Sequence, residues 1–276
     1  MTEIDTGTED LLGRVEDGVA VLTMNRPQRR NAFSGAMTAA LERVLAGVEV
    51  DDDVGCVVMT GAGGAFSAGG DVKAMAEGTQ AGGSTARRQS MDERIHLQRL
   101  NQRSTSGRLH EMPKPTIASL PGPAAGAGLA LALACDLRYA ASSAILTTAF
   151  ARVGFAGDYG GTWFLTRLVG PSKARELYYL SPRLTADEAA QLGILNAVFD
   201  DDELEEGVMA IARRLAAGPR LAFRYMKENL NRAVFGELGE CMDMEAAHHI
   251  RTGLTEDHRE AATAFVEKRE PVFRGR

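Results

Sequence analysis

Two stretches of small residues stand out in this sequence: Gly61-Ala62-Gly63-Gly64-Ala65-Phe66-Ser67-Ala68-Gly69-Gly70-Asp71 and Gly122-Pro123-Ala124-Ala125-Gly126-Ala127-Gly128. Each follows an apolar segment of strand length, 54–60 or 116–120, and each leads into a helical pattern. The start of a helix leaves N–H groups unpaired at the positive end of its dipole, and small side chains let a ligand approach the main chain. Two such turns that face each other would bind one oxyanion, although close packing alone also explains the glycines.

Neither turn has the pattern of a nucleotide-binding loop. The third glycine of GxGxxG is replaced by Phe66 in the first turn and by Leu131 in the second. The sequence also has no GxxxxGK[ST], the pattern that places N–H groups around phosphates. Dinucleotide-binding and P-loop functions are therefore not expected.

The segments around the two turns indicate an α/β fold. Short apolar runs at 11–15 and 19–24 flank an Asp-Gly pair, which favours the tight turn of a hairpin. Helical spacing over 36–50 and the apolar strand 54–60 then make a crossover unit. The alternation of strand, helix and strand returns at 116–120, 126–134 and 137–141. We expect a buried parallel sheet covered by helices.

From Arg175 onward the pattern is almost entirely helical. Thr185-Ala186-Asp187-Glu188 within it has the spacing of a helix capping box. Earlier in the chain, Gly78 to Ala86 indicates a surface loop or lid, and a polar helix follows from about 87 to 109. Without an internal repeat or a linker, we expect a core over residues 1–200 and a helical C-terminal region over 201–276.

Composition and charge exclude several classes of function. The 276 residues are 45% hydrophobic and 25% charged, which is typical of a globular chain of enzyme size. The net charge of -6 leaves no basic excess to neutralise a phosphate backbone, so nucleic acid is not an expected partner. The histidines lack metal-ligand spacing, so no metal is expected either.

Three further features favour the cytoplasm. The three cysteines are widely spaced and form no CxxC, which suits reduced thiols. The segment Met1 to Asp10 has no apolar stretch of the kind found in signal peptides. The longest apolar run, Ala124 to Ala134, is shorter than the ~20 residues that a membrane-spanning helix needs. We therefore expect neither a membrane partner nor export.

Taken together, the motifs resemble those of the crotonase superfamily of enoyl-CoA hydratases and isomerases over nearly the whole chain. The resemblance rests on the joint order of Asn25-Arg26-Pro27 with Asn31-Ala32, the loop Ala65 to Lys73, the segment from Gly122 to Asp136, the turn Asp158 to Thr162, and the end from Ala264 to Arg276. It implies a core of repeated ββα units wound into a spiral, and a helical C-terminal region that forms trimers. The implied substrate is an acyl-CoA, so coenzyme A enters with the substrate and no tightly bound cofactor is implied.

The resemblance also assigns site residues. Two backbone N–H groups hold the thioester oxygen in this family, and here they would belong to Ala68 and Ala127. Other residues would contact the coenzyme A portion: Arg26, Arg29 and Arg30 after the hairpin, and Ala65, Ala68, Gly69, Gly70 and Asp71 in the first turn. Phe265 and Lys268, on the last helix, would touch coenzyme A held by a neighbouring subunit of a homotrimer or a dimer of trimers.

One departure from the family pattern bears on the reaction. The hydratases of the family carry two glutamates, and the matching positions here are Ala130 and Phe150. Neither side chain can activate water or supply a proton. Asp158 instead matches an aspartate that is catalytic in the phenylacetate-pathway type of enoyl-CoA isomerase. We expect Asp158 to shuttle one proton between two carbons, with a pKa raised by the nearby aromatic residues Phe150, Phe155 and Trp163.

Several alternatives stay open at this point. Asp158 could simply cap the helix after it, and Asp71 has the position of an N-cap rather than of an acid that meets substrate. Ala65-Phe66-Ser67-Ala68-Gly69 is one residue from the GxSxG of serine hydrolases, with Asp158 and His248 as triad partners. Other readings are a hydratase with a different water-activating group, attack by Asp158 on an aromatic acyl-CoA as in dehalogenases, and an acyl-CoA binding protein without catalysis.

Overall fold

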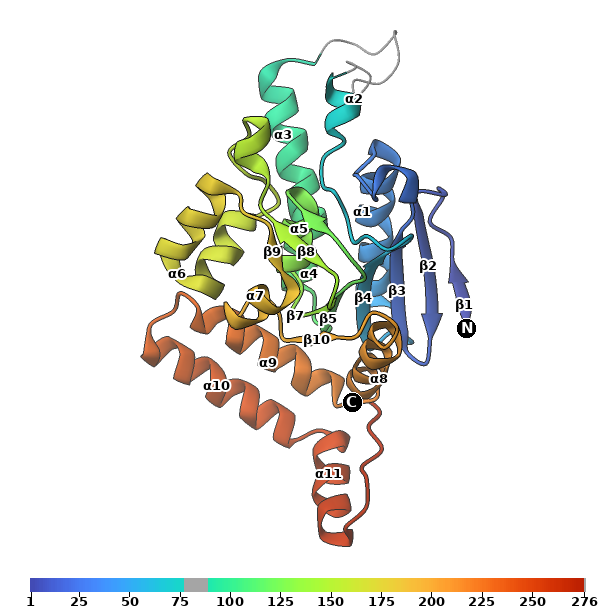
Figure 1. Ribbon diagram of the computed structural model, residues 1–276. Helices are drawn as coiled ribbons and strands as arrows, with labels where there is room; N and C mark the ends of the chain where they lie inside the picture. Colours follow the sequence, from blue (N-terminus) through green and yellow to red (C-terminus); the bar gives the residue numbers. More distant parts are fainter. Residues whose placement is uncertain (77–88, 276) are drawn as a thin grey trace.

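A seven-stranded sheet forms the centre of the protein (Figure 1). The computed structural model describes residues 1–76 and 89–275, and the loop expected over Gly78 to Ala86 lies outside them. The strand order is β1-β2-β3-β4-β5-β7-β10. Their bounds are Thr2–Ile4, Leu11–Glu16, Val19–Met24, Cys56–Gly61, Thr116–Leu120, Leu137–Ala141 and Ala197–Phe199. A smaller sheet joins β6, β8 and β9, at Ala124–Ala125, Ile145–Thr147 and Leu184–Thr185.

The main sheet is antiparallel at one edge, where β1 also pairs antiparallel with β2, and parallel over the rest. β2 and β3 pair antiparallel as the expected hairpin, with Asp17 and Gly18 at positive φ in its turn. From β3 to β10 each neighbouring pair is parallel. The prediction of a hairpin followed by a buried parallel sheet is therefore confirmed.

Side chains alternate between the two faces of each strand, and from β3 to β7 both faces are buried. In β4, Val57 and Met59 belong to one core cluster, and Cys56 and Val58 belong to the other. The first cluster takes its helical partners from α1 (Gly35–Val50) and α5 (Ala127–Leu133), and the second from α8 (Leu204–Ala216). Residues one helical turn apart, among them Met37, Leu41, Val44 and Val48, form the buried face of α1.

The remaining helices lie around this core. They are α2 (Val72–Ala76), α3 (Met91–Gln102), α4 (Arg108–Glu111), α6 (Gly161–Leu180), α7 (Ala186–Gln191), α9 (Arg220–Ala233), α10 (Leu238–Gly253) and α11 (Glu256–Glu267). The predicted capping box is present at the start of α7, where Thr185 and Glu188 satisfy each other's backbone N–H groups. The long polar helix expected near 87–109 ends instead at a π-helical segment, Arg103–Gly107, that separates α3 from α4.

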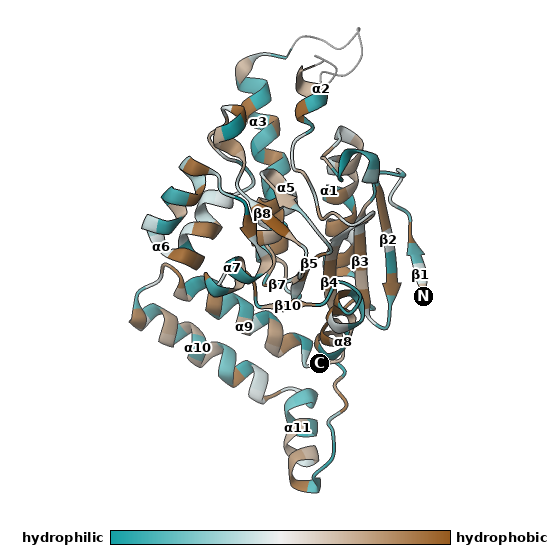
Figure 2. Ribbon diagram, viewed as in Figure 1, coloured by the Kyte–Doolittle hydropathy of each residue, from teal (hydrophilic) through white to brown (hydrophobic). Residues whose placement is uncertain are grey.

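The C-terminal helices differ in how they meet the core. α8 lies against the sheet, although it falls within the region 201–276 that the sequence predicts as separate. α9 and α10 pair with each other, and α11 projects away from the rest of the chain (Figure 1). Apolar residues recur along α9, α10 and α11 (Figure 2), and several are exposed, such as Leu230 at 68% and Ile250 at 64%. No helix in the described part of the chain is long and apolar enough to cross a membrane.

A buried ion pair ties α9 to the core. The Lys227 ammonium group, 8% exposed, donates to the carbonyls of Leu109 (2.9 Å) and Lys114 (3.1 Å) and to the carboxylate of Asp136 (2.8 Å). The same carboxylate accepts the backbone N–H of Thr116 at 2.8 Å. Lys227 thereby joins the start of β5, the end of α4 and the C-terminal helices.

Replacing Lys227 by Met should lower the free energy of unfolding by about 3 kcal/mol, because it removes the buried cation paired with the Asp136 carboxylate and one hydrogen bond to each of two carbonyls. Urea denaturation followed by circular dichroism would measure the loss. The control is Lys173→Met, which removes an exposed pair with Glu176 and should cost less than about 0.5 kcal/mol. Equal stability of the two variants would contradict the role given to Lys227.

Candidate active site

The two glycine-rich turns lie directly against each other. The N–H groups of Phe66 and Ser67 donate to the carbonyl of Pro123 at 3.0 and 3.2 Å, and Ala125 donates to the carbonyl of Ser67 at 2.9 Å. A Cβ added at Gly128 would lie 2.6 Å from the Cβ of Ser67. Glycine is therefore required at position 128 by close packing, and that packing brings the two turns together.

The turns also bring main-chain N–H groups together. Gly69 has φ +79°, and a Cβ there would lie 2.8 Å from the backbone nitrogen of Ala127. Ala127 is the first residue of α5, and its N–H has no acceptor within the described residues. Its position agrees with the sequence prediction of an anion-binding group.

The second predicted donor needs correction. The N–H of Ala68 donates to the carbonyl of Arg30 at 2.8 Å, so it is already used. The N–H of Gly69 donates to the Ser67 hydroxyl at 3.1 Å. The next amide, that of Gly70, has no acceptor in the part of the chain that the structure describes. Gly70 and Ala127 thus each have an unpaired amide at this junction, as far as the described residues show.

A buried asparagine, Asn31, fixes the shape of the first turn. Its side-chain NH₂ donates to the carbonyls of Ala62 (2.9 Å) and Ala65 (2.8 Å), and its oxygen accepts the N–H of Arg26 at 2.8 Å. The sequence places Asn31 in a recognisable motif but gives it no role. Its positive φ of 56° is a conformation that asparagine tolerates better than most residues.

Ser67 is structural rather than nucleophilic. Its hydroxyl is fully buried and donates to the carbonyl of Asn31 at 2.7 Å. His248, the proposed triad partner, lies on α10 with its Nδ1 2.6 Å from the side-chain oxygen of Asn229. Since Ser67 and His248 are each committed to other partners, the structure gives the serine-hydrolase alternative no support.

Asp71 and Arg26 form a structural pair beside the first turn. One oxygen of Asp71 accepts the N–H of Ala74 at 3.0 Å, and the other lies 3.3 Å from the Arg26 guanidinium. The hydrogen bond to Ala74 is the main reason that the pKa of Asp71 is lowered. The Arg26 guanidinium also donates to the carbonyl of Ala32 at 2.7 Å.

Of the three arginines predicted to contact coenzyme A, Arg26 is therefore engaged inside the protein. Arg29 is half-buried and Arg30 is exposed, and neither side chain has a hydrogen bond or ion pair with another described residue. Both remain able to bind a phosphate.

Asp158 lies in an environment that disfavours its charge. Its Oδ1 is buried and has no hydrogen-bond partner among the described residues. Burial raises the pKa of Asp158 to about 6, well above the ordinary range for aspartate. A helix cap would use the carboxylate as an acceptor, and no such bond is formed.

The wall near Asp158 is only partly the one predicted. Phe150 is 6% exposed and stacks on Tyr178 with ring centroids 5.8 Å apart. Phe155, by contrast, is 55% exposed, and Trp163 packs on Phe164 and against His110 rather than around the carboxylate. Tyr178, 20 residues after Asp158, was not expected in the site.

The turn that carries Asp158 adjoins the oxyanion turns. A Cβ at Gly161 would lie 2.9 Å from the Cβ of Ala130, which is one helical turn beyond Ala127. A Cβ at Gly126 would lie 3.9 Å from the ring of Phe150. The two positions that carry glutamate in the family's hydratases therefore line this region as a methyl group and an aromatic ring.

Phe265 and Lys268 do not reach the site of their own chain. They lie at the end of α11, which projects on the side opposite α2 and α3 (Figure 1). Phe265 is 85% exposed. Any contact of these residues with substrate requires another subunit.

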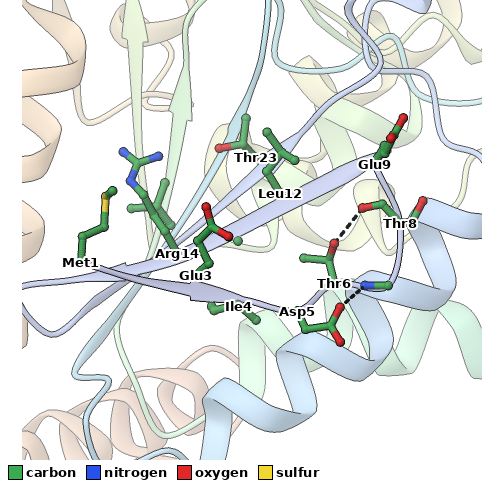
Figure 3. Close-up of a pocket in the computed structure, with 13 residues that line it drawn as sticks. Met1, Glu3, Ile4, Asp5, Thr6, Thr8, Glu9, Leu12, Arg14 and Thr23 are labelled. Atoms are coloured by element: carbon green, nitrogen blue, oxygen red, sulfur yellow. Dashed lines mark hydrogen bonds between the residues drawn. The ribbon is translucent and has the colours of Figure 1, made fainter.

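A cavity beside the N-terminal strands does not resemble a second active site. It has a volume of about 820 Å³ and lies beside β1 and β2 (Figure 3). Two of its polar groups bind the local backbone, since Asp5 accepts the N–H of Gly7 and Thr6 donates to the carbonyl of Thr8. Within the described residues, no cluster of three or more His, Cys, Asp or Glu could hold a metal ion.

The chain is similar to known proteins over nearly its whole length. Residues 14–276 match the enoyl-CoA hydratase/isomerase family. The 1,2-epoxyphenylacetyl-CoA isomerase of Escherichia coli K12 is 37% identical over 97% of this chain and 99% of its own length. A 4-chlorobenzoyl coenzyme A dehalogenase of Arthrobacter is 33% identical over 85% of this chain and 82% of its own.

Solved structures show the same fold. An enoyl-CoA hydratase subunit of Geobacillus kaustophilus has a TM-score of 0.85 at 36% identity, over 98% of this chain and 100% of its own. An enoyl-CoA hydratase of Bacillus anthracis has a TM-score of 0.87 at 30% identity, over 97% of this chain and 100% of its own.

Replacing Asp158 by Asn should stabilise the protein at neutral pH. The folded state raises the pKa of Asp158 to about 6, so above that pH the ionised group opposes folding. With allowance for solvent screening, we expect a gain of about 1–2 kcal/mol at pH 7.5. The gain should shrink as the pH falls below 6 and vanish below about 4, where both folded and unfolded chains carry the proton.

Thermal unfolding across this pH range would measure the gain from Asp158→Asn. The exposed Asp202→Asn is the matched control and should shift stability little at any pH. A destabilised Asp158→Asn at pH 7.5 would show that the carboxylate is a structural partner instead.

Proposed function

The chain belongs to the enoyl-CoA hydratase/isomerase family, and within this family of acyl-CoA enzymes we propose that it moves a carbon–carbon double bond of an enoyl-CoA. The observation that carries the proposal is the half-buried carboxylate of Asp158, whose buried Oδ1 has no hydrogen-bond partner among the described residues and whose pKa is raised to about 6. A group with such a pKa can both accept and return a proton near neutral pH. Asp158 therefore serves as the single acid and base.

The reaction begins at the paired turns. The N–H groups of Gly70 and Ala127 donate to the thioester oxygen and stabilise the negative charge that develops on it. Asp158 removes a proton from the carbon between the thioester and the double bond, and the electron pair shifts into a conjugated enolate. The same carboxyl group then returns the proton two carbons further along. No water is consumed, and the double bond ends next to the thioester.

Apolar side chains at positions 130 and 150 favour isomerisation over hydration. Addition of water needs one group to activate the water and another to supply a proton. Ala130 and Phe150 are both buried and carry no such group. Hydration would have to rely on Asp158 alone, so we rank a hydratase second.

A dehalogenase is the other alternative with a specific observation behind it. The 4-chlorobenzoyl coenzyme A dehalogenase of Arthrobacter is 33% identical to this chain. In that reading Asp158 attacks an aromatic carbon, forms an ester and displaces chloride, and water then hydrolyses the ester. Chloride release from 4-chlorobenzoyl-CoA would distinguish it from isomerisation.

We also propose that the working form is a homotrimer or a dimer of trimers. Exposed apolar residues on α9 to α11, including Leu230, Ile250 and Phe265, give these helices a surface suited to association. The placement of Phe265 and Lys268 far from their own site supports a role at a neighbouring one. We place the enzyme in the cytoplasm, acting on its acyl-CoA without a tightly bound cofactor.

The test of isomerisation uses 3-enoyl-CoA and 2-enoyl-CoA in heavy water. We expect the double bond to move and deuterium to enter at the α or γ carbon. Asp158→Asn should lower kcat by about 10²- to 10⁴-fold, because it removes the proton carrier. Asp202→Asn serves as the control with unchanged activity.

The pH dependence gives a second readout of the same experiment. The value of kcat/KM should rise as the pH increases through about 6, where Asp158 loses its proton. Formation of 3-hydroxyacyl-CoA would show that the enzyme is a hydratase and would contradict the proposed isomerisation. Full isomerase activity in Asp158→Asn would remove Asp158 from the mechanism.

The proposed assembly predicts the behaviour of Lys268→Ala. Sedimentation equilibrium should give a mass of three or six chains for the natural protein. Lys268→Ala should raise KM for an acyl-CoA about tenfold with little change in kcat, because a cation at the phosphates affects binding rather than chemistry. Lys173→Ala is the control. A fully active monomer would contradict the shared site.

A further inference from the structure

The hydroxyl of Tyr178 reaches the turn that carries Asp158. Its oxygen lies 2.6 Å from the position that a Cβ would take at Gly161 and 3.8 Å from the corresponding position at Gly157. Gly157 and Gly161 flank Asp158 in the sequence. The ring is held by parallel stacking on Phe150, with 5° between the two planes. The phenol therefore lies across the turn in a fixed orientation.

The same hydroxyl lies close to α5. The methyl group of Ala130 and the Tyr178 oxygen are both less than 3 Å from the Cβ position of Gly161. The ring of Phe150, stacked on Tyr178, lies 3.9 Å from the Cβ position of Gly126, beside Ala127. The Tyr178 side chain, from α6, thus lies close to Ala130. A longer side chain at position 130 of α5 would extend into the same space.

Both polar groups of this wall are unpaired. Within the described residues, neither the Tyr178 hydroxyl nor Oδ1 of Asp158 has a hydrogen-bond partner. Burial and the negative charge of Asp158 raise the pKa of Tyr178, so the phenol keeps its proton and acts as a donor. Asp158 moves protons in the proposed reaction, whereas the hydroxyl is left without a role.

We propose that Tyr178 determines substrate specificity by donating a hydrogen bond to an oxygen atom in the acyl group. A purely hydrocarbon chain would cover the hydroxyl without offering an acceptor, and an unpaired buried donor lowers affinity. An acyl group with a hydroxyl, oxo or ether oxygen satisfies the donor. The proposal rests on the proposed function, and it narrows the substrate class to oxygen-bearing acyl-CoA thioesters.

The test compares the binding of three thioesters that cannot isomerise: butanoyl-CoA, 3-hydroxybutanoyl-CoA and 4-hydroxybutanoyl-CoA. Isothermal titration calorimetry with the natural protein should show at least one hydroxylated thioester binding about 10- to 100-fold more tightly than butanoyl-CoA. Tyr178→Phe keeps the ring that stacks on Phe150, so it should fold normally. It should reduce the preference to less than about threefold while leaving the affinity for butanoyl-CoA unchanged or higher.

The matched control is Tyr179→Phe, since Tyr179 is 73% exposed on the same helix. It should retain the full preference for the hydroxylated thioester. Equal affinity of the natural protein for all three thioesters, or a preference that survives Tyr178→Phe, would overturn the proposal. The proposed function fails by different results. It would be rejected if the protein bound none of the thioesters, or if it did not exchange deuterium with an enoyl-CoA.

Discussion

The close approach of two main-chain turns is the constraint on which the site depends. Gly128 lies against Ser67 so tightly that a Cβ would overlap it, and a Cβ added at Gly69 would lie 2.8 Å from the nitrogen of Ala127. Hydrogen bonds from the first turn to Pro123 hold this contact. The contact explains why small residues gather at both turns, and it places amides from two separate strand–turn–helix units at one point. Close packing and the proposed binding of the thioester oxygen therefore depend on the same arrangement.

In the proposed mechanism, the Asp158 carboxylate can act as acid and base because the side chains around it are mostly apolar. At the two positions that carry glutamate in the family's hydratases, this chain has Ala130 and Phe150, so neither position carries a charge that would compete with Asp158. Burial raises the pKa of Asp158 to about 6, and its Oδ1 has no hydrogen-bond partner among the described residues. The same burial costs stability at neutral pH, as is common where an active group is held in an unfavourable environment. Tyr178 fits the same pattern, because it is a polar group kept unpaired in a packed aromatic wall.

Much of the fold could be predicted from local patterns. The hairpin at Asp17-Gly18, the amphipathic spacing of α1 and the alternating burial of β4 follow from turn chemistry and periodicity, which act over a few residues. The capping box at Thr185 belongs to the same class. The order of the motifs was also sufficient to indicate the family.

The parts that were missed depend on contacts between distant segments. Ala68 was predicted as a donor, but the carbonyl of Arg30 takes its N–H, and nothing in the first turn itself reveals that acceptor. Arg26 was predicted to meet coenzyme A, yet Asp71 pairs with it across 45 positions of the chain. Tyr178 enters the site because α6 folds back beside α5, a tertiary relation with no short-range signal.

The central claim is that Gly70 and Ala127 hold one thioester oxygen opposite Asp158. A crystal structure of the Asp158→Asn variant with unreacted 3-enoyl-CoA tests it most directly. We expect the oxygen at about 2.7–3.1 Å from both backbone nitrogens, with the side chain of residue 158 facing the carbon that loses its proton. An oxygen that contacts neither amide, or a side chain at 158 that faces away from the acyl group, would contradict the account.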